Sequence, residues 1–300
     1  MVSMGRDLDF EGLKLVFRRS AALPQLPGSA HRLLDAIDSG EASATDLERI
    51  ITCDASLTAN LLRLANSADS GLPGGITSVR SAILRLGHRA VRSMCVSLSV
   101  QNLLSKDERC ASFDPARYAY HGVTVGFLAR YIFARRKQKG EFESRWLPEE
   151  FFAAGLVHDI GHALLARVAP TIHSAVCGSA EANGTSFNGD FEKTYGGTIG
   201  ELGAIAATTW GLPTFFQSAI AFCEKPFDTT EENTAIYCLN YANALAVRMH
   251  ATIEIWPFAE ESDPMVTSDV GLDEKEVENL LKIVAAQTDT YLMNSGCLAA

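Results

Sequence analysis

The sequence predicts an all-α fold, and three observations support this prediction. Apolar residues recur three and four positions apart along most of the chain, which is the spacing of one face of an α-helix. The polar and apolar alternation typical of a half-buried strand never persists between turn residues. Capping residues and glycines divide the 300 residues into segments of helical length. We therefore expect helices joined by loops.

The first seventy residues predict a run of short amphipathic helices. The first helix carries Phe10 on its apolar face, and the second stops at Gly40. Ser43 and Asp46 have the spacing of a capping box, so they predict the start of a third helix. Asp54 is placed to cap a fourth helix.

Beyond a compact loop at 71–75, two helices are expected to flank Gly87, and a second block begins near Tyr118. In that block helices are predicted at 118–136, 148–167, 196–209, 213–223 and 232–250. Asp273 marks the predicted start of the last helix. Polar loops are expected at 137–147, 177–190, 225–232 and 257–272.

Composition excludes several classes of protein. The formal net charge of −10 argues against a protein that depends on unspecific contact with DNA phosphates. The most apolar stretch, 151–169, is interrupted by four polar or charged residues, so we expect no membrane span. The first residues lack the layout of a signal peptide, which favours a cytoplasmic location. The seven cysteines are never spaced as CxxC, so no zinc ribbon is expected.

The sharpest chemical feature is the adjacent pair His158 and Asp159. On a helix, neighbouring side chains lie about 100° apart, so both can converge on one ion held beside it. Imidazole and carboxylate suit iron, manganese or zinc, and His121 on another helix is the natural third ligand. Alternatively, Asp159 pairs with a histidine or caps a backbone amide. His162 repeats the spacing of zinc proteases, but Asp159 is shorter than their glutamate, so we set that class aside.

A basic stretch offers a second candidate site. It contains Arg80, Arg85, Arg89 and Arg92, with no acidic residue between Asp69 and Asp107. These arginines predict a surface for an anionic partner, and they leave DNA binding open as a third hypothesis. They can equally form a solvated face or pair with acidic residues such as Glu48.

Several short motifs along the chain match, in the same order, the pattern of one known family. They are Leu23-Pro24, the segment from Asp54 to Leu57, Asn66-Ser67-Ala68, Ile76-Thr77-Ser78 running into Leu86-Gly87, the sequence GLVHDIG at 155–161 and WGLP at 210–213. With these motifs, residues from about 20 to 250 resemble the HDOD family, the HD-related output domains of bacterial signalling proteins. The resemblance implies an all-α fold and a regulatory role.

The same resemblance divides the chain. It implies an HDOD domain over 21–250, with an N-terminal helical lobe at about 21–105 and an HD-like helical lobe at about 118–250. Residues 1–20 would form an extension helix. Residues 251–300 would form a loop and a helix that pack on the domain.

The site departs from the pattern of metal-dependent HD phosphohydrolases, whose ligands are a His, a His-Asp pair and a distant Asp. By resemblance, His121, His158 and Asp159 match the first three ligands, and Asn243 stands at the fourth. A neutral amide is a weaker ligand than a carboxylate, so the site loses charge and affinity. Relatives of the HD-GYP type add histidines for a second metal, where this chain has Thr198-Ile199 and Cys223-Glu224. We expect Glu224 to be an exposed loop carboxylate.

Two functions follow from these observations. The first is a non-catalytic signal-transduction module that binds a signalling protein or a small-molecule second messenger. The alternative is a metal-dependent phosphohydrolase with a reduced site, in which His158 and Asp159 would be catalytic and His162 could carry protons. The sequence commits to no cofactor; if His121, His158 and Asp159 hold one, their ligand types suit a single divalent ion (iron, manganese or zinc).

Overall fold

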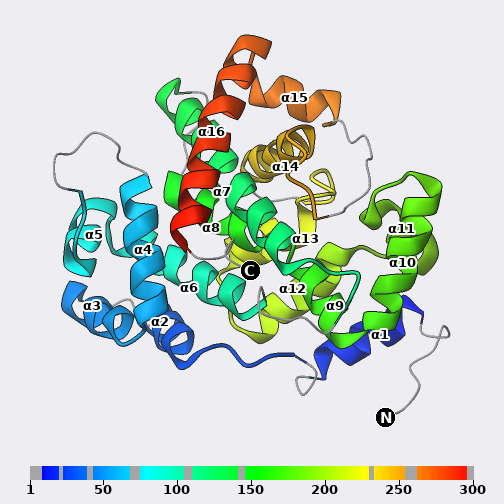
Figure 1. The fold of residues 1–300 in the computed structure, drawn as a ribbon, viewed down its shortest axis with the longest axis horizontal. Helices are drawn as coiled ribbons and strands as arrows, with labels where there is room; N and C mark the ends of the chain where they lie inside the picture. Colours follow the sequence, from blue (N-terminus) through cyan, green and yellow to red (C-terminus); the bar gives the residue numbers. More distant parts are fainter. Residues whose placement is uncertain are drawn as a thin grey trace.

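The computed structural model describes residues 9–19, 23–38, 43–67, 75–104, 110–140, 146–229, 233–253 and 262–295. Within these ranges every regular element is an α-helix, which confirms the predicted fold class. The N-terminal helices are α1 (Phe10–Arg18), α2 (Gly28–Asp38), α3 (Ala44–Thr52), α4 (Ala55–Ser67), α5 (Val79–Leu86) and α6 (His88–Leu104). Helices α2 to α6 pack together on the left of Figure 1.

Local signals set the boundaries of these helices. The capping box of Ser43 and Asp46 is present at the start of α3. The Asp54 carboxylate accepts a hydrogen bond from the Leu57 amide at 2.9 Å, so it caps α4 as predicted. Gly87 has a φ of +84°, a value that suits glycine, and it separates α5 from α6. Most of the predicted loop at 71–75 lies outside the described residues.

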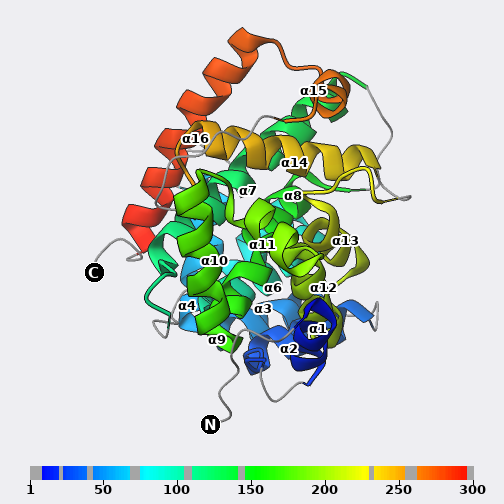
Figure 2. The ribbon, with the colours of Figure 1, turned by 90° about the vertical axis from the view of Figure 1, so that its right-hand side faces the viewer.

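The remaining helices form the larger part of the molecule. They are α7 (Pro115–Gln138), α8 (Pro148–Val157), α9 (Ile160–Val168), α10 (Pro170–Asn183), α11 (Phe187–Tyr195), α12 (Ile199–Thr209), α13 (Thr214–Phe222), α14 (Asn233–Arg248), α15 (Pro264–Val270) and α16 (Glu274–Ser295). Helices α9 to α11 lie on the right of Figure 1, and α14 to α16 lie at the top. In Figure 2, α14 crosses α7 below α15.

The prediction of loops was wrong for two stretches, which contain helices in the structure. The stretch 177–190 contains the end of α10 and the start of α11, which are separated by a left-handed Gly184. Most of α10 faces outward, so its few buried residues give a weak periodic signal. The stretch 257–272 contains α15, where the Asp263 carboxylate accepts a hydrogen bond from the Met265 amide. Seven residues are too few to show a helical period.

Helices α7 and α8 form the centre of the fold, and glycines allow their close approach. A Cβ added to Gly155 would lie 2.5 Å from the backbone nitrogen of Gly126, closer than real contacts allow. The aromatic rings of Phe127 and Phe152 pack beside this contact, with centroids 4.9 Å apart. On its other side α8 packs against α6, so one apolar core joins the N-terminal helices to the rest.

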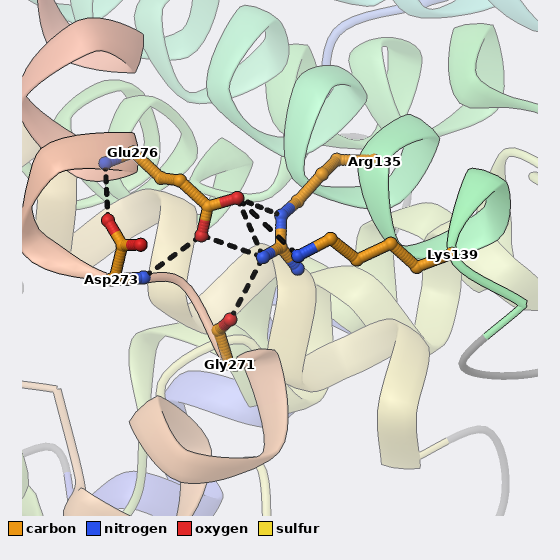
Figure 3. Close-up of polar contacts among 5 residues, drawn as sticks. All are labelled: Arg135, Lys139, Gly271, Asp273 and Glu276. Carbon is orange, nitrogen blue, oxygen red and sulfur yellow. Dashed lines mark hydrogen bonds and ion pairs between the residues drawn. The ribbon is translucent and has the colours of Figure 1, made fainter.

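The first and last described helices connect distant parts of the chain. Helix α1 packs on α12, where a Cβ on Gly197 would overlap the Phe10 ring. Helix α16 runs along α7 and reaches α4 (Figures 1 and 2). Its start is fixed by Glu276, whose carboxylate accepts hydrogen bonds from Arg135 at 2.7 and 2.8 Å (Figure 3). Lys139 lies 3.5 Å from the same carboxylate.

One stretch of the described residues, Pro148–Val168, is long and apolar enough to cross a membrane by length and composition alone. It comprises α8 and α9, and 89% of its most apolar window is buried inside the fold. A helix that is apolar on all sides is typical of the core of a large domain. The burial therefore accounts for the composition of this stretch.

Candidate metal centre

The predicted helix over 148–167 is interrupted at His158 and Asp159, so its continuity was wrongly predicted. Helix α8 ends at Val157, and α9 begins at Ile160. Asp159 has a φ of −103° and a ψ of 24°, outside the helical region. Its carboxylate makes no capping hydrogen bond to α9, because it points toward two histidines instead.

His121, His158 and Asp159 meet in the interior, as the sequence analysis expected. The Nε2 atoms of the two histidines are 3.3 Å apart. One oxygen, Asp159 Oδ2, lies 3.0 Å from His121 Nε2 and 3.2 Å from His158 Nε2. The three side chains are between 1 and 11% exposed. Helix α7 supplies His121, and the turn between α8 and α9 supplies the other two.

Backbone carbonyls fix the orientation of both imidazoles. His121 Nδ1 lies 2.6 Å from the carbonyl oxygen of Ala251, and His158 Nδ1 lies 2.8 Å from that of Gly155. Because a carbonyl only accepts, each Nδ1 must carry a hydrogen. In the neutral rings both Nε2 lone pairs therefore face the Asp159 carboxylate.

Three electron-pair donors that converge in a buried space require a positive charge between them. A shared proton or a metal ion would supply it, and histidines that donate Nδ1–H to carbonyls are the usual arrangement around metals. Burial alone would raise the pKa of Asp159, but the two imidazoles hold that pKa well below its usual range. The carboxylate is thus charged and ready to bind a cation, so this donor set fits a divalent ion.

A second donor set shares Asp159. Ligand atoms of Asp159, His162 and Glu224 lie within 4.8 Å of one another. The expectation of an exposed Glu224 was therefore wrong, because this residue is half-buried and accepts a hydrogen bond from Asn188. His162 is 2% exposed, and its Nδ1 atom has no hydrogen-bond partner. No sequence spacing could indicate this contact, since Glu224 follows α13, far along the chain.

Asn243 lies on α14 beside this region. Its side chain is 8% exposed, and its Oδ1 atom has no hydrogen-bond partner. Together with Glu224 and Asn240 it lines a cavity of about 520 Å³. A buried amide oxygen without a partner is costly, so it favours a ligand or water at this place.

The four arginines of the basic stretch do not share one environment. Arg80 donates a hydrogen bond to Glu48 at 2.8 Å, and Arg85 is exposed. Arg89 donates to the buried Glu150 at 2.8 Å and lies over the Trp146 ring. Arg92 reaches the backbone carbonyl of Ala36 at 3.4 Å. At least three of these guanidinium groups therefore take part in contacts within the molecule.

The all-α core, with a His and a His-Asp pair on adjacent helices, defines an HD-type helical domain. The HDOD domain is the family whose sequence model matches residues 23–226. The chain therefore belongs to the HDOD family. An uncharacterized protein of Treponema pallidum (strain Nichols) is 25% identical over 225 residues. These are 74% of this chain but 41% of the relative, so this chain spans about two fifths of that protein's length.

Solved structures share the fold. An HDOD domain protein of unknown function from Geobacter sulfurreducens is 17% identical, with a TM-score of 0.68 over 96% of this chain and 98% of that one. A candidate phosphohydrolase from Shewanella amazonensis is 21% identical, with a TM-score of 0.68 over 94% and 97%. A candidate signal transduction protein from Marinobacter aquaeolei is 22% identical, with a TM-score of 0.71 over 96% and 65%. At these identities the likeness concerns the fold alone.

Proposed function

We propose that this HDOD protein is a cytoplasmic, non-catalytic signal-transduction module that relays input by binding a signalling protein or a small-molecule second messenger. The observation that carries the proposal is the ligand set. By resemblance its fourth position holds the neutral Asn243, which would weaken a metal centre relative to one with a carboxylate. Membership of the HDOD family, whose model matches residues 23–226, supports the same role.

In this proposal His121, His158 and Asp159 hold one divalent ion. The ion would act as a Lewis acid toward an oxygen ligand. The carbonyls of Ala251 and Gly155 keep both Nε2 atoms aimed at the ion position.

Elemental analysis tests the proposal. Protein purified without chelators should contain about one equivalent of iron, manganese or zinc, and a His158→Ala/Asp159→Ala variant should contain none. His31→Ala, on the exposed side of α2, is the control and should keep the ion. None of the three proteins should hydrolyse nucleotides or cyclic dinucleotides. Turnover by the natural chain that disappears in the double variant would disprove the non-catalytic role.

The alternative function, a metal-dependent phosphohydrolase, is favoured by the second donor set. Asp159 belongs to both sets, so Asp159 with His121 and His158 would hold one ion, and Asp159 with His162 and Glu224 would hold a second. Such a pair of ions would supply Lewis-acid chemistry toward a phosphoryl substrate. This alternative predicts two equivalents of metal. It also predicts that Glu224→Gln removes one of them together with phosphatase activity toward 4-nitrophenyl phosphate, whereas Glu181→Gln changes neither.

A further inference from the structure

A second cavity shares a wall with the candidate metal centre. It measures about 350 Å³, within the size range of sites for small ligands. Helix α10 forms one side, and the segment before α7 forms another. Its lining includes Ser112, His162, Ser174, Cys177, Phe187 and Ile253. His162 therefore belongs both to this cavity and to the donor set of Asp159 and Glu224.

The polar groups in the cavity wall are hydrogen-bonded to one another, but some of their atoms have no hydrogen-bond partner. The Ser112 hydroxyl lies 2.8 Å from His173 Nδ1 and 2.9 Å from the Ser174 hydroxyl. His173 is 2% exposed, and its Nε2 atom has no hydrogen-bond partner. His162 Nδ1 also lacks one. Two buried ring nitrogens without partners beside one cavity indicate a place where a bound molecule supplies polar contacts.

The charge of the lining residues indicates which sign of charge a ligand of this cavity would carry. Asp114 and Glu181 are the carboxylates among the lining residues, and no lysine or arginine of the described chain lines the cavity. Asp114 already caps α7 and lies 3.9 Å from the Arg117 guanidinium, so Glu181 supplies the uncompensated negative charge. Glu181 makes no ion pair with any described residue. Phe187 and Ile253 offer apolar surface to the same space. An anion would be repelled here, whereas an ammonium group on an apolar body would be attracted.

We propose that this cavity binds a small organic ammonium compound and that its occupancy is the input which His162 transmits to the metal centre. The first half of the proposal concerns binding alone. The second half rests on the proposed regulatory function, because it requires that the centre holds an ion.

Three probes of equal size test the binding: benzylamine, benzyl alcohol and benzoate, titrated by calorimetry into the metal-free chain. Benzylamine should bind, benzyl alcohol should bind at least tenfold more weakly, and benzoate should not bind. Gly178→Phe should abolish binding, since Gly178 lines the cavity and a Cβ on it meets no atom within 4 Å. Ala175→Phe, on the exposed part of the same helix, should bind as the natural chain does.

Three results would overturn the binding site: no heat with benzylamine, binding of benzoate as tight as that of benzylamine, or unchanged binding in Gly178→Phe. Coupling between the cavity and the metal centre is measured separately, as the affinity for Mn²⁺. Saturating benzylamine should shift this affinity by at least threefold in the natural chain and should not shift it in Gly178→Phe. Binding of benzylamine without that shift would retain the site and refute its regulatory role. Failure of the chain to bind Mn²⁺ at all would refute the proposed centre instead.

Discussion

The two imidazoles of the candidate centre are oriented by main-chain carbonyls rather than by side chains. The carbonyl oxygen atoms of Ala251 and Gly155 fix the rings of His121 and His158. The orientation of both Nε2 atoms therefore depends on the backbone path of α8 and of the segment that follows α14. Substitution of neighbouring side chains should therefore change the charge of the site without turning its ligands. Asn243 is the residue at which such a change is most informative.

We predict that Asn243→Asp strengthens metal binding. The substitution preserves shape and adds a negative charge where the Asn243 oxygen lacks a partner. Titration with Mn²⁺ or Zn²⁺ should show an affinity at least tenfold higher than that of the natural chain. Asn240→Asp, in the same cavity lining, is the control and should change the affinity less. Equal affinity for Asn243→Asp and the natural chain would show that this position does not face the ion.

Sequence reasoning reached the residues of the first donor set because His158 and Asp159 are adjacent and His121 completes a known pattern. It named Glu224 but expected an exposed carboxylate, since the approach to His162 depends on how α9 and α13 both pack against α12. It missed His173, whose exterior neighbours in α10 resemble a polar loop. Such contacts between distant segments leave no periodic or spacing signal in the chain.

At the scale of elements, glycines determine how closely the helices around the centre approach. Gly161 lies where α9 meets α12, and a Cβ there would stand 2.3 Å from the carbonyl oxygen of Ile199. The sequence analysis predicted a helix over 148–167, in which Gly161 has no evident role. The structure shows that the missing side chain permits the contact between the two helices.

We predict opposite effects for two glycine substitutions. Gly161→Ala should destabilise the fold by about 3 kcal/mol, because backbone atoms must move apart to admit the methyl group. Gly178→Ala should stabilise it by about 0.5–1 kcal/mol, since this helical position has open space and alanine loses less entropy. Urea denaturation measures both. Equal stability of Gly161→Ala and the natural chain would contradict the tight contact of α9 with α12.

At the scale of the whole molecule, α16 joins the end of α7 to the N-terminal helices. The hydrogen bond from Arg135, followed by that from the Asp273 amide, lowers the pKa of Glu276 to about 2 (Figure 3). The ordinary value is 4.5, so the ionised form is stabilised by folding. This contribution to stability is complete above pH 4.5 and disappears as the pH falls toward 2.

We therefore predict a pH-dependent effect of Glu276→Gln. Its melting temperature should be lower than that of the natural chain at pH 7, and the difference should shrink between pH 4.5 and 2. Glu278→Gln, an exposed neighbour on the same helix, should differ little from the natural chain at every pH. A difference for Glu276→Gln that does not change with pH would show that the carboxylate charge has no part in anchoring α16.

The packing of α1 on α12 has a consequence for the order in which the chain is made. Helix α1 is synthesised before α12, and the surface that covers Phe10 is encoded about 190 residues later. At ordinary rates of translation this delay is roughly 10–40 s. Throughout that interval α12 is not there for the apolar face of α1 to pack on, so nascent chains that end before α12 should expose this face to chaperones and proteases.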